Sequence, residues 1–306
     1  MTQALGESGA ARPGPTTPAG DGRAATKRRG WGWLLLLPGM LWLLVFFIYP
    51  TVQLFFTSLY DPSGSFEQGY AMTGHFANYA DAVKDTWNLF ARSFLYAGIA
   101  TVVCLVLGYP LAYAIAFKAG RWKYVMLVLV IAPFLTSFLL RTLAWRTILS
   151  DNGFVTSSLQ TIGLLPDNGR LLATPVAVIA GLIYNFLPFM TLPLYASLDK
   201  VDPRLIEAAG DLYSRPFEGF RKVTFPLSLP GVVSGTLLTF IPACGDYINA
   251  ELLGTPKQYM VGNRIQAAFL TEHNYPLAAS LSIILMLVVV VMVFLYVRRA
   301  GTEELV

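Results

Sequence analysis

Six long apolar runs dominate this sequence, and they restrict it to a fold built from membrane-spanning helices. An α-helix rises about 1.5 Å per residue, so about 20 apolar residues cross a hydrocarbon core of ~30 Å. Hydrophobic residues make up 55% of the chain and charged residues only 13%, roughly half the charged share of a soluble domain. The predicted fold class is an all-α membrane protein with six transmembrane helices, at about 31–56, 93–117, 124–148, 174–198, 232–253 and 276–297.

The two ends of the chain differ from its apolar body. Residues 1–30 are rich in Ala, Gly, Pro and Thr and have no apolar face to bury, which predicts a disordered tail. The first apolar run is longer than a signal-peptide core and lacks a small-residue cleavage site, so we expect it to stay in the protein as a helix. The predicted organisation is a tail over 1–30, a transmembrane domain over 31–299 and a second tail over 300–306.

The distribution of basic residues predicts the orientation in the membrane. If the N-terminus is cytoplasmic, 15 of the 22 Lys and Arg residues fall on the cytoplasmic side of the six runs, in agreement with the positive-inside rule. We therefore expect a multi-pass membrane protein with both termini in the cytoplasm. The net charge of +4 is explained by this topology signal, so no nucleic-acid partner is predicted.

The Cys and His residues predict neither a disulfide framework nor a metal site. Cys104 and Cys244 both lie inside long apolar runs, where a thiol behaves as a small hydrophobic group. His75 and His273 are isolated in predicted external segments and have no ligand-spaced partners. We therefore expect no metal bound to this chain.

The longest predicted cytoplasmic connection, residues 199–230, has the pattern of two short helices. Asp202 followed by Pro203 is typical of a helix start, because the carboxylate can cap free amides and the proline suits the first turn. Ser214 and Pro216 interrupt this helix and favour a new one. The first helix then has an apolar stripe formed by Leu205, Ala208, Ala209 and Leu212. From geometry alone, the pair either docks a partner or only braces the bundle at the membrane surface.

A motif in this connection resembles the EAA loop of permeases from ATP-binding cassette (ABC) importers. It consists of Glu207, Ala208 and Ala209, followed by Leu212 and the proline-containing exit 226–231. The family pattern has a glycine six residues after the glutamate, where this chain has Tyr213. The resemblance implies that the loop 203–224 forms a coupling helix pair that docks on a separate ATPase. The residues to which it assigns this role are Glu207, Ala208, Ala209, Asp211, Leu212, Tyr213 and Phe217.

The similarity extends over most of 31–299 and is greatest to the first permease of the polyamine (spermidine/putrescine) branch. The segments that resemble this branch are LGYPLAYAIA from Leu107, PFLTSFLLRTLAW from Pro133, LTFIPACGDYINAELLG from Leu238 and YMVGNRIQAAFL from Tyr259. The resemblance implies a permease of the bacterial inner (plasma) membrane that forms half of a path for a small solute, with a polyamine as the expected cargo. Related permeases for iron, thiamine, sulfate or phosphonates are the alternatives.

The same resemblance implies several partners besides the lipid bilayer. These are two ATPase subunits, a second permease that is expected to be a paralogue, and an external substrate-binding protein. The chain lacks a Gly-rich phosphate loop with its Lys, so we expect no cofactor in this chain, with ATP and Mg bound by the ATPase subunits. The predicted external segment 57–92 is mildly acidic, which fits either a partner surface or an ordinary solvated loop.

Two other classes of function are disfavoured. An intramembrane enzyme is not expected, because HExxH and GxSxG motifs are absent and the SxxK match at 197–200 has no companion motifs. A self-powered channel or carrier is expected to contain an inverted repeat of its spans. The sequence shows no such repeat, and an EAA-like loop would have no role in a carrier of that kind.

Ionisable and polar residues inside the apolar runs are the candidates for the substrate path. Asp246 and Glu251 lie in the fifth run, and Gly245 next to Asp246 can interrupt the helix there. With Tyr247 and Asn249, this break would offer a cation a carboxylate, an amide and an aromatic face. In the alternative interpretation, Asp246 caps a broken helix or pairs with Arg141 or Arg146.

Three further residues are weaker candidates for the same path. Tyr184 and Asn185 lie near the middle of the fourth run, where polar groups usually face the bundle interior. Hydrogen bonds between packed helices are the alternative explanation for both. Trp145, at the end of the third run, is either a cation contact or a residue of the interfacial aromatic belt.

Overall fold

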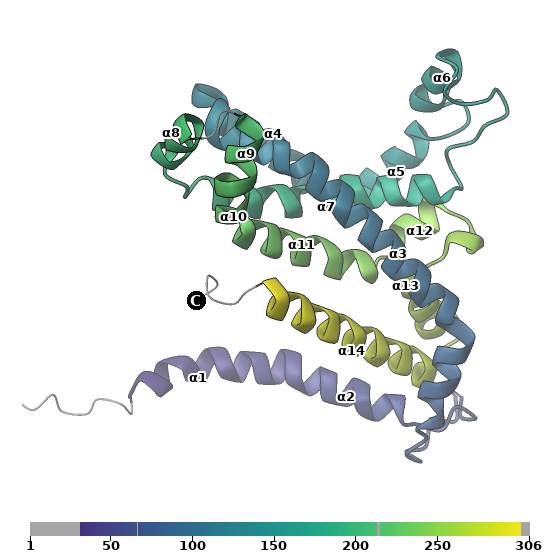
Figure 1. The fold of residues 1–306 in the computed structure, drawn as a ribbon. Helices are drawn as coiled ribbons and strands as arrows, with labels where there is room; N and C mark the ends of the chain where they lie inside the picture. Colours follow the sequence, from purple (N-terminus) through teal and green to yellow (C-terminus); the bar gives the residue numbers. More distant parts are fainter. Residues whose placement is uncertain (1–30, 66, 213–214, 301–306) are drawn as a thin grey trace, which may run out of the picture. The chain divides into compact units, whose positions relative to one another are not determined.

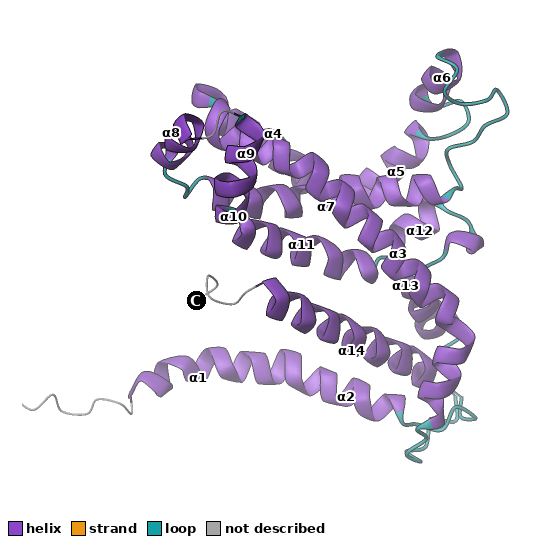
Figure 2. Cartoon of the chain, in the orientation of Figure 1, coloured by secondary structure: helices purple, strands orange, loops and turns teal. Residues whose placement is uncertain are grey.

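The computed structural model describes residues 31–65, 67–212 and 215–300. Helices and loops account for these ranges, and their only β-type pairings are the isolated bridges Tyr60–Met72 and Ser65–Gly69 (Figure 2). The all-α class predicted from the sequence is confirmed. The predicted tail 1–30 and the position of Tyr213 lie outside the described residues.

The chain divides into two units, of which the first ends at Pro50 and the second begins at Thr51. The first unit contains α1 (Trp31–Leu43) and the π-helical turn η1 (Leu44–Ile48), which continues directly into α2 (Tyr49–Ser58). Together they give the first apolar helix expected from the sequence. Pro38 lies inside α1. Proline has no backbone N–H, so the helix lacks one backbone hydrogen bond at this residue.

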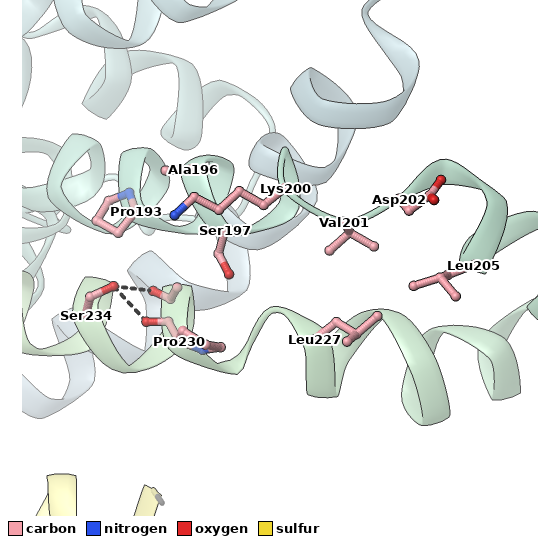
Figure 3. A pocket seen from close by; sticks show the side chains of 11 residues that line it. Pro193, Ala196, Ser197, Lys200, Val201, Asp202, Leu205, Leu227, Pro230 and Ser234 are labelled. Atoms are coloured by element: carbon pink, nitrogen blue, oxygen red, sulfur yellow. Dashed lines mark hydrogen bonds between the residues drawn. The ribbon is translucent and has the colours of Figure 1, made fainter. Parts of the chain in front are cut away.

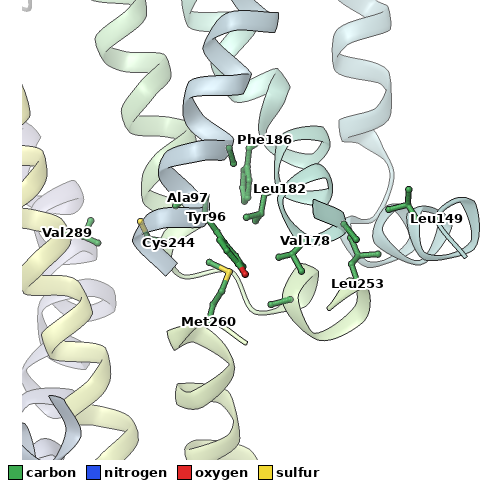
Figure 4. Close-up of a cluster of buried hydrophobic side chains, with 14 residues drawn as sticks. Tyr96, Ala97, Leu149, Val178, Leu182, Phe186, Cys244, Leu253, Met260 and Val289 are labelled. Carbon is green, nitrogen blue, oxygen red and sulfur yellow. The ribbon is translucent and has the colours of Figure 1, made fainter. Parts of the chain in front are cut away.

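Three helices form the centre of the second unit: α3 (Ala77–Tyr113), α7 (Pro175–Leu198) and α11 (Leu229–Cys244). They pack along one another in Figure 1. Their shared core contains Ala97 and Ala100 from α3, Leu182 from α7, and Ala243 and Cys244 from α11 (Figure 4). Small residues at these positions allow helix backbones to approach closely, as is usual between membrane helices.

The last helix, α14 (Tyr275–Ala300), packs against α3. A smaller cluster joins the two helices to α13 (Val261–Gln266) through the buried residues Ala82, Phe90, Val261 and Leu281. The π-helical turn η7 (Ala267–Thr271) connects α13 to the loop before α14. α13 is thereby fixed beside the end of α11, where the candidate site lies.

The third apolar run is strongly bent rather than straight, which corrects the predicted helix 124–148. It follows η2 (Ala114–Lys118) and η3 (Gly120–Trp122), and consists of α4 (Lys123–Ile131), η4 (Ala132–Leu135) and α5 (Phe138–Ile148). The two arms meet at 94°. Pro133 removes a backbone donor, and Thr136 and Ser137 are extended with ψ of 156° and 134°, which stops the helix.

The number of spans depends on how bent helices are counted. Four helices in the described ranges are long and apolar enough to cross a membrane, namely Leu36–Ser58, Ala77–Lys118, Pro175–Leu198 and Tyr275–Arg299. Two bent pairs raise the number to six if each is one span. The second pair is Pro216–Leu227 with Leu229–Cys244, bent by 66°.

α3 also begins at Ala77, well before the predicted start at 93, because polar residues continue the helix beyond the apolar run.

The remaining elements are short helices at the two ends of the bundle. α6 (Phe154–Thr161) lies between the third and fourth apolar runs. α12 (Ile248–Leu253) and η6 (Pro256–Gln258) follow the break at the end of α11. The predicted cytoplasmic connection contains α8 (Pro203–Leu212), α9 (Pro216–Gly219), η5 (Phe220–Thr224) and α10 (Phe225–Leu227).

We expect the Gly231→Ala substitution to destabilise the bundle, because α11 approaches α7 too closely at this glycine to admit a Cβ atom. A Cβ atom on Gly231 would lie 2.5 Å from the Ser197 Cβ and 2.9 Å from the Pro193 carbonyl oxygen. Overpacking of this kind costs about 1–3 kcal/mol. Gly98→Ala in α3 is the matched control, because its Cβ would meet nothing within 4 Å. Thermal unfolding of the purified permease checks the expectation, and equal midpoints for the two variants would contradict it.

Candidate functional site

The fifth apolar run is interrupted at residues 245–247, as predicted. α11 ends at Cys244 and α12 begins at Ile248. The Asp246 carboxylate is buried at 9% exposure, and its Oδ1 atom accepts a hydrogen bond of 2.9 Å from the backbone N–H of Asn249. Asp246 therefore caps the first turn of α12, which was one of the two alternatives for this residue. The other alternative, an ion pair with Arg141 or Arg146, is not formed among the described residues.

Neighbouring helices hold the break in place. The Asn263 side chain on α13 donates a hydrogen bond of 2.9 Å to the Tyr247 carbonyl and accepts one from the Met260 N–H. A Cβ on Gly262 would lie 2.5 Å from the Gly245 carbonyl oxygen, so only glycine permits this approach of α13. Backbone groups freed by the break thus find partners inside the protein, as a break at membrane depth requires.

A chain of buried polar side chains connects α5, α7 and α12 next to Asp246. The Asn185 amide nitrogen donates to the Thr142 hydroxyl at 3.2 Å and to the Asn249 side-chain oxygen at 3.1 Å. Asn185 and Asn249 are at most 1% exposed. Gly181 allows this arrangement, because a Cβ there would lie 2.6 Å from the Asn249 Oδ1. Hydrogen bonds between packed helices, the alternative weighed for Asn185, are therefore present.

Several buried polar atoms of this cluster have no hydrogen-bond partner among the described residues. They are the Oδ1 atom of Asn185, the Nδ2 atom of Asn249, and the Nε and Nη1 atoms of Arg141. The Arg141 guanidinium lies 5.7 Å from the ring centres of both Phe134 and Phe138. The cluster thus combines a free acceptor and a free amide donor with the buried carboxylate of Asp246, and the buried cation of Arg141 immediately precedes Thr142 on α5. From the sequence, Arg141 is a predicted ion-pair partner of Asp246, and a basic residue inside an apolar run is itself a signal of function.

The other predicted path residues lie around this cluster rather than in it. The Tyr247 ring is 38% exposed and the Glu251 side chain is exposed. Trp145 and Tyr184 contact each other, with ring centres 5.3 Å apart. Tyr184 also lines a cavity of about 310 Å³ whose other walls are the apolar residues Leu111, Met126, Leu129, Val130, Pro133, Leu187 and Pro188. The predicted path residues therefore divide into a buried Asp246–Asn249–Asn185 group and a separate Trp145–Tyr184 pair.

The predicted coupling loop forms a second candidate site. α8 begins at Pro203 as predicted, and the Asp202 carboxylate accepts a hydrogen bond from the Arg204 N–H at 2.9 Å. Of the predicted apolar stripe, only Ala209 is buried, next to Gly219 of α9. Leu212 is 78% exposed and Phe217 is 70% exposed. The side chains of Leu205, Glu207, Ala208 and Asp211 are exposed as well.

The connection to α8 is fixed at its start by a polar contact between α4 and α7. Lys123 Nζ lies 2.5 Å from Asp199 Oδ1, and the Tyr195 hydroxyl donates to Asp199 Oδ2 at 3.1 Å. The hydrogen bond from Lys123 holds the pKa of Asp199 below its ordinary value. The carboxylate is therefore charged at neutral pH, and α7 ends at a defined place before the loop.

A cavity of about 620 Å³ lies between the end of α7 and the start of α11 (Figure 3). Ser197 and Lys200 line one side of it, and Leu227, Pro230 and Ser234 line the other. Asp202 and Leu205 line it from the start of α8. α8 thus begins at the edge of this cavity.

Residues 33–300 match the model of the family described as binding-protein-dependent transport system inner membrane component. This chain belongs to that family, the permeases of ABC importers. The permease is 36% identical over 262 residues to the spermidine/putrescine transport system permease protein PotB of Haemophilus influenzae, covering 84% of this chain and 90% of the relative. It is 35% identical to the PotB protein of Escherichia coli K12, with 85% and 94% covered.

More distant proteins extend the comparison. The inner membrane ABC transporter permease protein YdcU of Escherichia coli K12 is 29% identical over 71% of this chain and 73% of its own. A crystal structure of a bacterial ABC transporter that imports the acidic polysaccharide alginate has a TM-score of 0.65 at 19% identity, covering 91% of this chain and 98% of that one. A crystal structure of a bacterial alginate ABC transporter in complex with an alginate pentasaccharide-bound periplasmic protein has a TM-score of 0.63 at 21% identity, with 90% and 97% covered. These likenesses establish the permease fold.

We expect Asn185→Ala to destabilise the permease by roughly 1 kcal/mol, because it removes two hydrogen bonds between membrane helices. Among the described residues, only Asn185 makes side-chain hydrogen bonds to both Thr142 and Asn249. Tyr184→Phe is the control, because the Tyr184 hydroxyl makes no hydrogen bond to another described residue. Thermal unfolding of the two purified variants measures the difference. An unchanged midpoint for Asn185→Ala would show that these two hydrogen bonds contribute nothing to stability.

Proposed function

We propose that this permease forms half of the membrane path of an ATP-driven polyamine importer, with spermidine or putrescine as cargo. The observation that carries the proposal is its 36% identity to a spermidine/putrescine permease over 84% of the chain. Two ATPase subunits, a second permease that is a paralogue, and an external binding protein complete the importer. The importer of alginate has been captured with its periplasmic protein, which supports the last of these partners. Both termini lie in the cytoplasm.

Asp246 supplies a binding point for an ammonium group of the cargo. A polyamine carries several ammonium groups that lose water on entering the membrane, and a buried carboxylate can replace part of that hydration. Asp246 is buried, is held in orientation by the Asn249 N–H, and has no cation partner among the described residues. The free Oδ1 atom of Asn185 is a second acceptor in the same cluster. The half-exposed ring of Tyr247 follows directly and offers an aromatic face.

Asp246→Asn keeps the size of the side chain and its cap on Asn249 but removes the charge. We expect it to lower polyamine uptake into proteoliposomes by about 10-fold or more, since one lost charge contact is worth at least ~1.4 kcal/mol. Basal ATPase activity and subunit assembly should be retained at an assay temperature below the thermal midpoint of the variant. Asp167→Asn, which neutralises an exposed acid in the segment between α6 and α7, is the matched control and should transport normally. Normal uptake by the Asp246→Asn importer would eliminate the cargo role.

The α8–α9 pair docks on the ATPase and passes its movement to the bundle. Glu207, Ala208, Ala209, Asp211, Leu212, Tyr213 and Phe217 form this docking surface. The exposure of Leu212 and Phe217 supports the proposal, because two large apolar side chains on a helix tip outside the bundle gain stability from a protein partner. The opposite interpretation is a pair that braces the bundle at the membrane surface, where lipid would cover the same apolar side chains.

Glu207→Lys reverses an exposed charge on α8. We expect it to abolish cargo-stimulated ATPase activity while the permease stays folded, because a misplaced charge in an interface costs binding but an exposed side chain contributes little to the core. Copurification of the ATPase and cargo-stimulated hydrolysis are the measurements. Glu67→Lys, an equally exposed charge reversal in the loop between α2 and α3, is the control. A Glu207→Lys importer with normal ATPase copurification and transport would refute the docking role.

A further inference from the structure

Arg141 is a buried cation for which the described residues provide no acceptor. It is 7% exposed, and its Nε and Nη1 atoms are enclosed without a hydrogen-bond partner. The rings of Phe134 and Phe138 face the guanidinium at 5.7 Å, but aromatic faces accept no strong N–H hydrogen bond. A charge held this way away from water is unfavourable unless another state of the protein gives it a partner.

Asp246 is the complementary group. Its carboxylate is also buried, and it accepts a hydrogen bond from a neutral amide but contacts no cation of the described residues. The two charges belong to one cluster: Thr142, the neighbour of Arg141, is linked through Asn185 to Asn249, which binds Asp246. α5, which carries Arg141, packs directly on α12. One unpaired charge of each sign is therefore buried on adjacent elements.

Both charges also lie beside backbone breaks that can change their position. Arg141 is in the first turn of α5, next to the 94° bend at Thr136 and Ser137. Asp246 lies within the break between α11 and α12. Small changes of backbone angles at such breaks move a side chain without unwinding a helix, which is how hinges between rigid elements work.

We propose that Arg141 is the internal counter-ion of Asp246: in a second conformation of the importer, reached by movement at the two backbone breaks, the two side chains pair, and an ammonium group of the cargo displaces the guanidinium. The inference rests on the proposed cargo role of Asp246. It makes Arg141 a specificity-determining residue, because a cation passes only if it binds Asp246 well enough to replace an arginine. A multiply charged polyamine meets this condition more readily than a simple monovalent amine, since its other ammonium groups add contacts.

A double-mutant cycle on the complete importer tests the pairing. Arg141→Gln, Asp246→Asn and the double variant are purified with all partner subunits, and their thermal midpoints are compared without cargo. Each single variant leaves the opposite charge without a partner, so each should lower the midpoint by several degrees. The double variant should recover more than half of the larger loss. Arg146→Gln, which removes an exposed charge on the same helix, is the control and should leave the midpoint unchanged.

Additive losses in the cycle would overturn the pairing, and so would a stabilising effect of Arg141→Gln alone. If neither single variant assembles, the charge swap Arg141→Asp with Asp246→Arg decides: assembly recovers if the two residues pair, and fails if Arg141 pairs with a carboxylate of the second permease. Arg141→Lys keeps the charge and should behave nearly like the unmodified importer.

Uptake measurements separate this inference from the proposed function. With Arg141 removed, Asp246 holds the cargo without a competitor, so Arg141→Gln should lower both the KM for spermidine and the maximal uptake rate. A purely structural role would lower the maximal rate and leave the KM unchanged, which would contradict the inference. Normal uptake by Asp246→Asn contradicts the proposed function instead. Lost uptake by Asp246→Asn combined with additive midpoints retains that function and removes only the role of Arg141.

Discussion

The hydrogen bonds at the break between α11 and α12 are the interactions on which the rest of this permease depends. A helix interrupted inside an apolar run exposes backbone groups that lipid cannot satisfy, so the break requires partners from neighbouring helices. Asp246 caps α12 from within the break, and Asn263 on α13 donates to the Tyr247 carbonyl. The same break brings Asn249 into contact with Asn185 of α7. The contact of α13 with the break and the buried hydrogen bond between α7 and α12 thus both depend on the same interruption of the helix.

This arrangement connects the interior cluster with the surface that is proposed to meet the ATPase. α7 carries Asn185 in its middle, and it ends at Leu198, just before Asp199 bonds to Lys123 and the chain enters α8. α11 runs from the close crossing at Gly231 to the break itself. Because α7 and α11 pack along each other, displacement of α8 would be transmitted to both ends of the Asp246 cluster. Coupling between distant sites is carried by packed side chains and rigid elements that have two discrete arrangements.

Local rules predicted the features that depend on a few neighbouring residues. The start of α8 at Pro203 and the break at Gly245 were read from the sequence, because capping and proline geometry are local. Hydropathy does not predict the bend at Thr136. It depends on the composition of the run and is nearly unaffected when the helix axis changes direction. The pairing of Asp246 with Arg141 or Arg146 was left open because it depends on distances between helices, and the described residues contain no such pair. The exposure of Leu212 on the predicted apolar stripe could not be predicted for a related reason. An amphipathic pattern shows that a helix has an apolar face, but not whether that face packs against the same chain or another one.

The most direct test of the account is the uptake of spermidine by the importer reconstituted with its partner subunits in proteoliposomes. ATP-dependent accumulation of labelled spermidine that excess putrescine reduces, and that sulfate, phosphonate, thiamine and iron do not, is the result the account predicts. A reconstituted complex that hydrolyses ATP in response to its binding protein but accumulates one of those other solutes, and no polyamine, would contradict it.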